Sequence, residues 1–153
     1  MNIDRARPKA SVWRVTPRAS IEAECLRVGT ATFVAKCVQI LSTGDIDEAT
    51  LLVLAGPGAR EVLRGREGGV SGHWPRVWAM RAFLYAWEDS ATRVVIEGAN
   101  DESWRVREMC AKVVARRRVV DAFDAVATLG NDPVLRVRTA AQRALVRLVE
   151  SEA

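Results

Sequence analysis

The sequence predicts an all-α fold in which antiparallel helix pairs stack side by side, without strands. Three observations lead to this prediction: a 31-residue internal repeat, helical spacing of apolar residues inside each unit, and helix-start residues at the unit boundaries. The chain has 153 residues, of which 49% are apolar, and this suffices for the core of a single domain.

The repeat becomes visible when the sequence is shifted along itself by 31 positions. This shift brings Arg76, Arg107 and Arg138 into register, and small or apolar residues follow them in step. Further aligned sets are Trp78, Met109 and Ala140; Ala79, Cys110 and Ala141; Arg81, Lys112 and Arg143; and Phe83, Val114 and Leu145. So many matches at one offset indicate internal repetition.

The first segment of each unit has the apolar spacing of a helix, with apolar residues at i, i+3, i+4, i+7 and i+8. These residues are Val106, Met109, Cys110, Val113 and Val114 in one unit, and Val137, Ala140, Ala141, Ala144 and Leu145 in the next. Asp132 is expected to be an N-cap, with Pro133 at the first helical position. The second segments are expected to begin at Ser90 and Asp121, which gives two helices per unit.

The N-terminal half is less regular. Residues 21–41 form a predicted helical stretch that contains Gly29. Residues 46–55 and 59–63 form a predicted helical pair with Asp45 or Asp47 as its cap, and residues 64–72 a loop. The expected organisation is a basic N-terminal arm at 1–18 and one domain at 19–153. That domain contains degenerate helices at 19–65 and repeats at 74–100, 101–131 and 132–153.

Charge and cysteine content narrow the classes of function. The net charge of +4 is carried by the first twenty residues, where five basic residues face one aspartate, so the rest of the chain is neutral. Cys25, Cys37 and Cys110 lack metal-ligand spacing and are interpreted as reduced core residues of a cytoplasmic protein. No apolar run approaches the roughly 20 residues of a membrane span, so no membrane partner is expected.

Two stretches at the unit boundaries resemble the HEAT repeat family, especially its short bacterial units. They read Asp-Glu-Ser-Trp-Arg-Val-Arg at 101–107 and Asn-Asp-Pro-Val-Leu-Arg-Val-Arg at 131–138. The resemblance covers about residues 74–149 and implies a short right-handed α-solenoid that serves as a scaffold. Two features depart from the family: the unit is shorter than the roughly 40 to 47 residues that are typical, and the last unit stops after its first helix.

The resemblance also implies a structural ladder, in which the second arginine of each motif pairs with the acid at a unit boundary. Its members here are Arg107 and Arg138, with Asp101 and Asp132 as the acids. Helical geometry permits this role, because Arg107 lies beside Val114 at the edge of the apolar stripe. A half-buried arginine is tolerated only when it is paired.

A candidate partner-binding surface follows from a second stripe on the same helices. Its members are Trp74, Arg81, Tyr85, Trp104, Arg105, Lys112, Arg116, Arg136, Arg143 and Arg147. Stacked units would align them into rows of cations with aromatic residues at one end, a chemistry suited to phosphates or acidic proteins. The alternative is a solvated helix face, on which Glu102 and Glu108 offset the charge locally.

Residues suited to catalysis are few. His73 is the only histidine, so a histidine-rich metal site is excluded and any serine or cysteine nucleophile would have to share that one base. The glycines at 65, 68 and 69 lack the lysine and hydroxyl residue of a phosphate-binding loop. We therefore expect no catalytic residue, no cofactor and no metal.

The first functional hypothesis is a non-catalytic scaffold or adaptor for an unidentified protein partner. The alternative is nucleic-acid binding through the arginine and lysine rows and the basic arm. A third hypothesis is a relative of the alkylpurine DNA glycosylases, which are also HEAT-like, although their Trp, Asp and Arg cluster is not placed in this sequence. Self-association through the C-terminal helix is expected if Leu145 and Leu148 are partly uncovered.

Overall fold

The computed structural model describes residues 15–150, and all regular structure in that range is helical. The all-α prediction is therefore confirmed. Most of the predicted basic arm, residues 1–14, lies outside the described residues. The α-helices are α2 (Pro17–Val28), α3 (Thr30–Thr43), α4 (Glu48–Ala55), α5 (Pro57–Leu63), α6 (Trp74–Ala82), α7 (Thr92–Gly98), α8 (Trp104–Arg117), α9 (Phe123–Leu129) and α10 (Leu135–Glu150).

Helix α2 begins at Pro17, two residues before the predicted domain boundary. Thr16 caps it by accepting a hydrogen bond from the amide of Ala19, and Pro17 occupies a first-turn position where no amide hydrogen is needed. The predicted stretch at 21–41 is helical except for a break at Gly29, whose φ is 91°. Helices α2 and α3 meet there at an angle of 117°.

Helices α4 and α5 form the short pair expected from the sequence. Asp47 is the cap of α4 and accepts a hydrogen bond from the amide of Ala49, while Gly56 ends α4 and Pro57 begins α5. A segment without regular helix follows at 64–73 and leads into α6. These helices lie at the N-terminal end of the stack, where α3 and α4 pack against α6.

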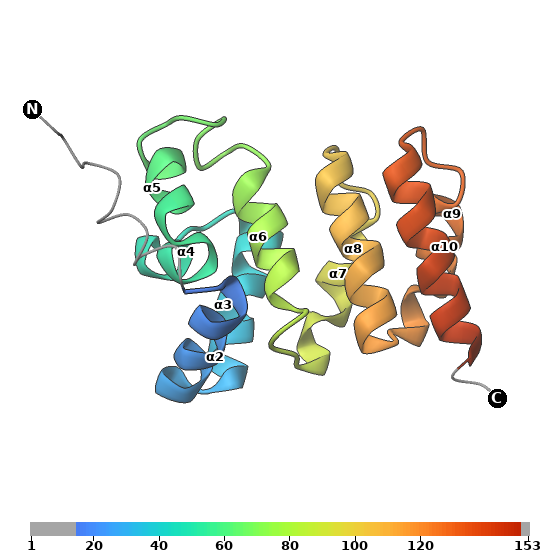
Figure 1. Ribbon diagram of the computed structural model, residues 1–153, viewed down its shortest axis with the longest axis horizontal. Helices are drawn as coiled ribbons and strands as arrows, with labels where there is room; N and C mark the ends of the chain where they lie inside the picture. The colour runs from blue at the N-terminus through green and yellow to red at the C-terminus, as the bar shows by residue number, and fades with distance from the viewer. Residues whose placement is uncertain (1–14, 151–153) are drawn as a thin grey trace, which may run out of the picture.

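Helices α6, α8 and α10 lie side by side in sequence order and form one layer of the C-terminal half (Figure 1). Helices α7 and α9 lie behind them and form a second layer. Each is preceded by a 3-10 turn, η1 (Asp89–Ala91) before α7 and η2 (Val120–Ala122) before α9. Ser90 and Asp121 therefore lie inside these turns and are not the helix caps that the sequence suggested.

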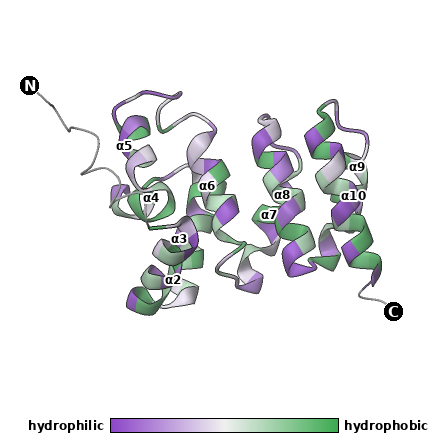
Figure 2. Ribbon diagram, in the orientation of Figure 1, coloured by the Kyte–Doolittle hydropathy of each residue, from purple (hydrophilic) through white to green (hydrophobic). Residues whose placement is uncertain are grey.

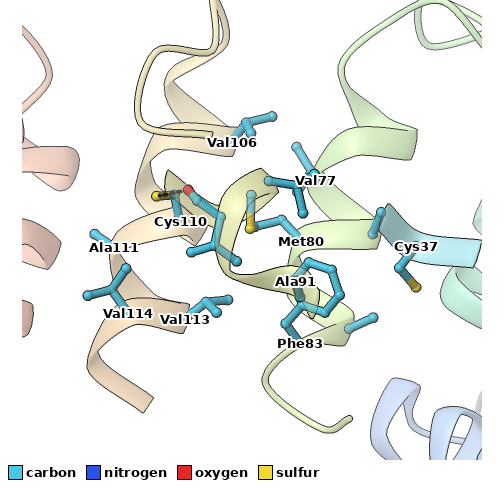
Figure 3. Packing of buried hydrophobic residues seen from close by; sticks show 14 of the residues in the cluster. Cys37, Val77, Met80, Phe83, Ala91, Val106, Cys110, Ala111, Val113 and Val114 are labelled. Atoms are coloured by element: carbon cyan, nitrogen blue, oxygen red, sulfur yellow. Dashed lines mark hydrogen bonds between the residues drawn. The ribbon is translucent and has the colours of Figure 1, made fainter. Parts of the chain in front are cut away.

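The core runs between the layers. Met80 of α6 lies in its middle, with Cys110 of α8 on one side and Cys37 of α3 on the other (Figure 3). The thiol of Cys110 donates to the carbonyl of Val95 in α7 at 3.0 Å. Each fully buried valine or leucine in such a core contributes roughly 1.5–3 kcal/mol to stability.

The start of α10 differs from the prediction. The helix begins at Leu135, so Pro133 precedes it and does not occupy the first helical position. Asp132 accepts a hydrogen bond from the amide of Val134 at 2.9 Å, and the same carboxylate is held by Arg107. The aspartate thus fixes the turn before the helix rather than its first turn.

The outer end of α10 also differs from the prediction. Leu148 is only 3% exposed, so it does not provide an uncovered apolar surface, and Leu145 is half-buried. The exposed apolar residues of this helix are Leu135, Val146 and Val149.

No single helix among residues 15–150 has both the length and the apolar character needed to cross a membrane. Only the bent pair α2 and α3, taken together, meets the test of length and composition.

Candidate binding surface

Two arginine–aspartate pairs tie neighbouring units together with the same geometry. The guanidinium of Arg76 donates to the carboxylate of Asp101 at 2.8 and 3.1 Å, and that of Arg107 donates to Asp132 at 2.7 and 3.3 Å. Each pair spans 25 residues, and the second repeats the first after 31 positions. We call these two pairs the Arg–Asp ladder.

Backbone groups complete each rung of the ladder. Arg107 also donates to the carbonyls of Asp101 and Glu102, and Asp101 in turn accepts from the amide of Ser103. The Arg107 side chain is 15% exposed and that of Asp132 is 5% exposed. Burial alone would raise the pKa of Asp132, but hydrogen bonds from Arg107 and the Val134 amide lower it below its ordinary value. The carboxylate is therefore held in its charged form.

Of the four residues predicted for this ladder, Arg107, Asp101 and Asp132 are members of it, and Arg138 is not. Asp101 is held by Arg76, which the repeat alignment contains but the interpretation left out. Arg138 donates to the backbone carbonyl of Asp132 at 2.7 Å. The register of Arg76 with Arg107 was the signal that could have identified the first rung.

Charge is divided between the two helix layers. Helices α6, α8 and α10 carry eleven arginine and lysine residues and two glutamates. Helices α7 and α9 with their 3-10 turns carry one arginine and four acidic residues, all exposed. Both α8 and α10 also carry hydrophobic residues between the hydrophilic ones (Figure 2). One side of the stack is therefore basic and the other is acidic.

Six cations of the first layer form a surface that we call the basic face. They are Arg105, Lys112 and Arg116 on α8, and Arg136, Arg143 and Arg147 on α10. Arg105 is half-buried and the other five are exposed. All six belong to the candidate surface predicted from the sequence.

Arg81 is placed differently from the other cations of that predicted surface. Its guanidinium donates to the carbonyl of Leu54 at 2.6 Å, and burial lowers its pKa. Tyr85 is half-buried. Arg117, on α8, likewise donates to the carbonyl of Phe83 at 2.7 Å. Arg81 and Arg117 thus join helices to the neighbouring backbone and are not part of the basic face.

Aromatic rings and guanidinium groups alternate along the starts of the first-layer helices. Arg105 lies between two indoles, 5.5 Å from the ring centroid of Trp74 and 4.6 Å from that of Trp104. Arg136 lies 5.3 Å from the same Trp104 ring. Trp74 stacks in turn on Trp78, which is buried. Such cation–π contacts orient a guanidinium while leaving the N–H groups at its edge able to bind an anion.

A groove of about 460 Å³ lies between α8 and α10, beside this row. Its lining residues are Glu108, Lys112, Ala115, Leu135, Arg136, Thr139, Ala140 and Arg143. The carboxylate of Glu108 accepts a hydrogen bond from Arg136 at 3.2 Å and lies 3.2 Å from the ammonium of Lys112. Cationic side chains therefore line the groove from both helices, together with the apolar residues Leu135, Ala115 and Ala140 and the buried Glu108.

Groups suited to catalysis do not gather in the part of the chain that the structure describes. No cluster of three or more potential metal ligands occurs among these residues. His73 lies against Trp74, and burial together with the nearby charges of Arg105 and Arg76 lowers its pKa. Burial raises the pKa of Cys37 and of Cys110 to about 12, which keeps both thiols protonated.

Comparison with models of protein families, with curated proteins and with solved structures finds no match to this chain.

Proposed function

We propose that the chain is a short right-handed α-solenoid of the HEAT kind, acting as a non-catalytic scaffold or adaptor that binds an acidic protein partner through its basic face. The observation that carries this proposal is the separation of charge between the two helix layers. A neutral body with scattered charges would have no preferred side for a partner. Here α8 and α10 offer cations in two adjacent rows, and acidic residues lie on the opposite layer.

The repeated ladder supports the solenoid part of the proposal. Equivalent contacts at a spacing of 31 residues favour units that are related by similar displacements. Packed helices lie about 8–10 Å apart, so side chains at equivalent positions form rows with that spacing. A stack of this kind presents an extended surface and needs no enclosed pocket.

A titration with the isolated partner tests the function. The partner is recovered from native cell lysate, identified, purified and titrated against the chain. We expect a fixed stoichiometry, weaker binding at high salt, and a loss of binding of at least tenfold in the double variant Arg136→Glu/Arg143→Glu. The matched control, Arg27→Glu/Arg93→Glu, changes the net charge equally at exposed sites away from the basic face. Equal losses in both variants, or stoichiometric binding that neither affects, would refute the proposal.

The rows of cations also favour a second candidate function, nucleic-acid binding. This candidate requires that affinity for duplex or single-stranded DNA falls steeply with salt, because each neutralised phosphate releases counterions. Charge reversal at Arg105, Arg136 and Arg143 would have to weaken binding further. Fluorescence anisotropy at two salt concentrations measures both effects, and an absence of binding at low salt would exclude this function.

A further inference from the structure

The groove between α8 and α10 has the character of a site for an amphipathic segment. Leu135 is 66% exposed at one end of it, and the half-buried Ala115 contributes further apolar surface. Lys112 lies on the α8 rim, and Arg136 and Arg143 lie on the α10 rim. A ligand with one apolar face and acidic residues on both flanks fits this arrangement. It would bury its apolar face in the groove, and its acidic residues would pair with the cations on either side.

The spacing of the cations matches that of a helix. Arg105 and Lys112 are seven residues apart on α8, and Arg136 and Arg143 are seven apart on α10. At a rise of 1.5 Å per residue, each pair is separated by about 10.5 Å along its helix. Carboxylates that recur every seven residues on a partner helix have the same separation. One straight helix can therefore place carboxylates opposite the cation pair of α8 and opposite the cation pair of α10.

Arg105 is prepared to receive a carboxylate. Trp74 and Trp104 flank its guanidinium, which limits the orientations that the side chain can adopt. Among residues 15–150, the guanidinium of Arg105 has no partner for an ion pair or a hydrogen bond. An oriented cation loses less conformational entropy on binding than a mobile one. Its planar N–H groups match the two oxygens of a carboxylate.

Glu108 favours a polypeptide over a nucleic acid as the occupant. Its side chain is 11% exposed, lines the groove and contacts both Lys112 and Arg136. A nucleic-acid strand carries a charge about every 3.4 Å and cannot omit one, so a phosphate would approach this carboxylate. A peptide can place an uncharged residue there. The exposed apolar side chain of Leu135 would also remain unused by a phosphate backbone.

We propose that the groove between α8 and α10 binds an acidic amphipathic helix of a partner protein, and that Arg105 anchors one of its carboxylates. This inference rests on the proposed function and specifies the partner. The mode of binding is a helix laid in a groove, where apolar residues supply affinity and flanking charges fix the register.

Two labelled 21-residue peptides provide the test. Both have leucine at heptad positions a and d, and they have the same composition. The matched peptide has glutamate at e and g, beside the apolar stripe, which also opposes pairing of the peptide with itself. The control peptide has its glutamates at b and f, away from the stripe. We expect anisotropy titrations with the full chain to show at least tenfold tighter binding of the matched peptide, and equal affinities would overturn the inference.

Variants of the chain identify the anchor. Arg105→Gln should weaken binding of the matched peptide about tenfold, whereas Arg93→Gln, on α7, should leave it unchanged. Arg143→Gln, on α10, provides a second measurement of peptide affinity in a variant that leaves the contacts of Trp74 and Trp104 intact. Circular dichroism shows whether each variant keeps its helices. Full binding by Arg105→Gln would overturn its role as the anchor, and full binding by both Arg105→Gln and Arg143→Gln would overturn the proposed register.

The outcomes also separate this inference from the proposed function. If the matched peptide fails to bind while Arg136→Glu/Arg143→Glu still abolishes binding of the natural partner, the helical ligand is wrong and the scaffold function stands. If that double variant binds the partner normally, both are wrong. Tighter binding of a 20-base-pair duplex than of the matched peptide, at physiological salt, would overturn the inference in favour of nucleic acid.

Discussion

Arg107 on α8 holds the carboxylate of Asp132, 25 residues further along the chain, at 2.7 Å. Arg76 on α6 holds Asp101 in the same way at 2.8 Å. Each aspartate lies in the turn that follows a second-layer helix and precedes the next first-layer helix. Each rung of the ladder therefore connects a first-layer helix to the turn that precedes the next first-layer helix.

Removal of one rung should destabilise the protein more than removal of an exposed pair. Arg107→Ala leaves the Asp132 carboxylate buried and unpaired, and we expect a loss of about 3 kcal/mol in the free energy of unfolding. Arg93→Ala removes an ion pair from an arginine that is 88% exposed, and should cost less than about 0.5 kcal/mol. Urea unfolding measures both, and equal losses would contradict a structural role for the ladder.

Acid should weaken the fold through Asp132. Its pKa in the folded state lies below the ordinary value of 3.8, so the unfolded chain takes up a proton first as the pH falls. The stabilisation is complete above pH 3.8 and is lost as the pH falls through the lower pKa of the folded state. Asp132→Asn should be less stable at pH 7 and should lose less stability between pH 5 and pH 2. Unfolding curves with the same pH dependence in both proteins would show that Asp132 does not contribute.

The three thiols should differ in reactivity. Burial raises the pKa of Cys37 and Cys110 to about 12, whereas Cys25 is half-buried. At pH 8 we expect a thiol-specific reagent to modify Cys25 first in the folded chain, and all three cysteines at similar rates in urea. Cys25→Ser should remove the fast reaction. Rapid modification of Cys37 or Cys110 in the folded state would contradict the packing shown in Figure 3.

Two glycine substitutions should have opposite effects. Gly29 has a φ of 91° with open space around it, so Gly29→Ala should cost about 1 kcal/mol through backbone strain alone. Gly58 lies in α5, and an added methyl group would make ordinary contact with Trp78 at 3.9 Å. Gly58→Ala should therefore stabilise the chain by about 0.5 kcal/mol. Thermal unfolding measures both changes. A Gly29→Ala variant that is not destabilised would contradict the assigned break between α2 and α3, and a destabilised Gly58→Ala variant would contradict the open packing around Gly58.

The helical character of the chain could be predicted because apolar spacing is a local property. The alignment of Arg76, Arg107 and Arg138 at intervals of 31 residues could also be predicted, because it is a property of the sequence alone. The break at Gly29 was missed because a single glycine inside an apolar stretch does not show whether the helix continues. The first residue of α10 was missed because Asp132 is occupied by Arg107, and that contact spans 25 residues.

The composition of the candidate binding surface could only partly be predicted from the sequence. Stripes of cations on each helix could be predicted, since they follow from the helical period. The inward placement of Arg81 depends on the carbonyl of Leu54, which belongs to a helix outside the regular repeats. The contact of Arg136 with Trp104 requires the packing of two units. The sequence alone therefore could not distinguish exposed cations from those bound to the backbone.

The most direct test of the account is a map of the partner's footprint on the chain by hydrogen–deuterium exchange. We expect the bound partner to slow exchange in α8 and α10, and to leave α7 and α9 as they are in the free protein. The same map made with Arg136→Glu/Arg143→Glu should show no protection at an equal partner concentration. Protection confined to α7 and α9, with the basic face unchanged, would contradict the account.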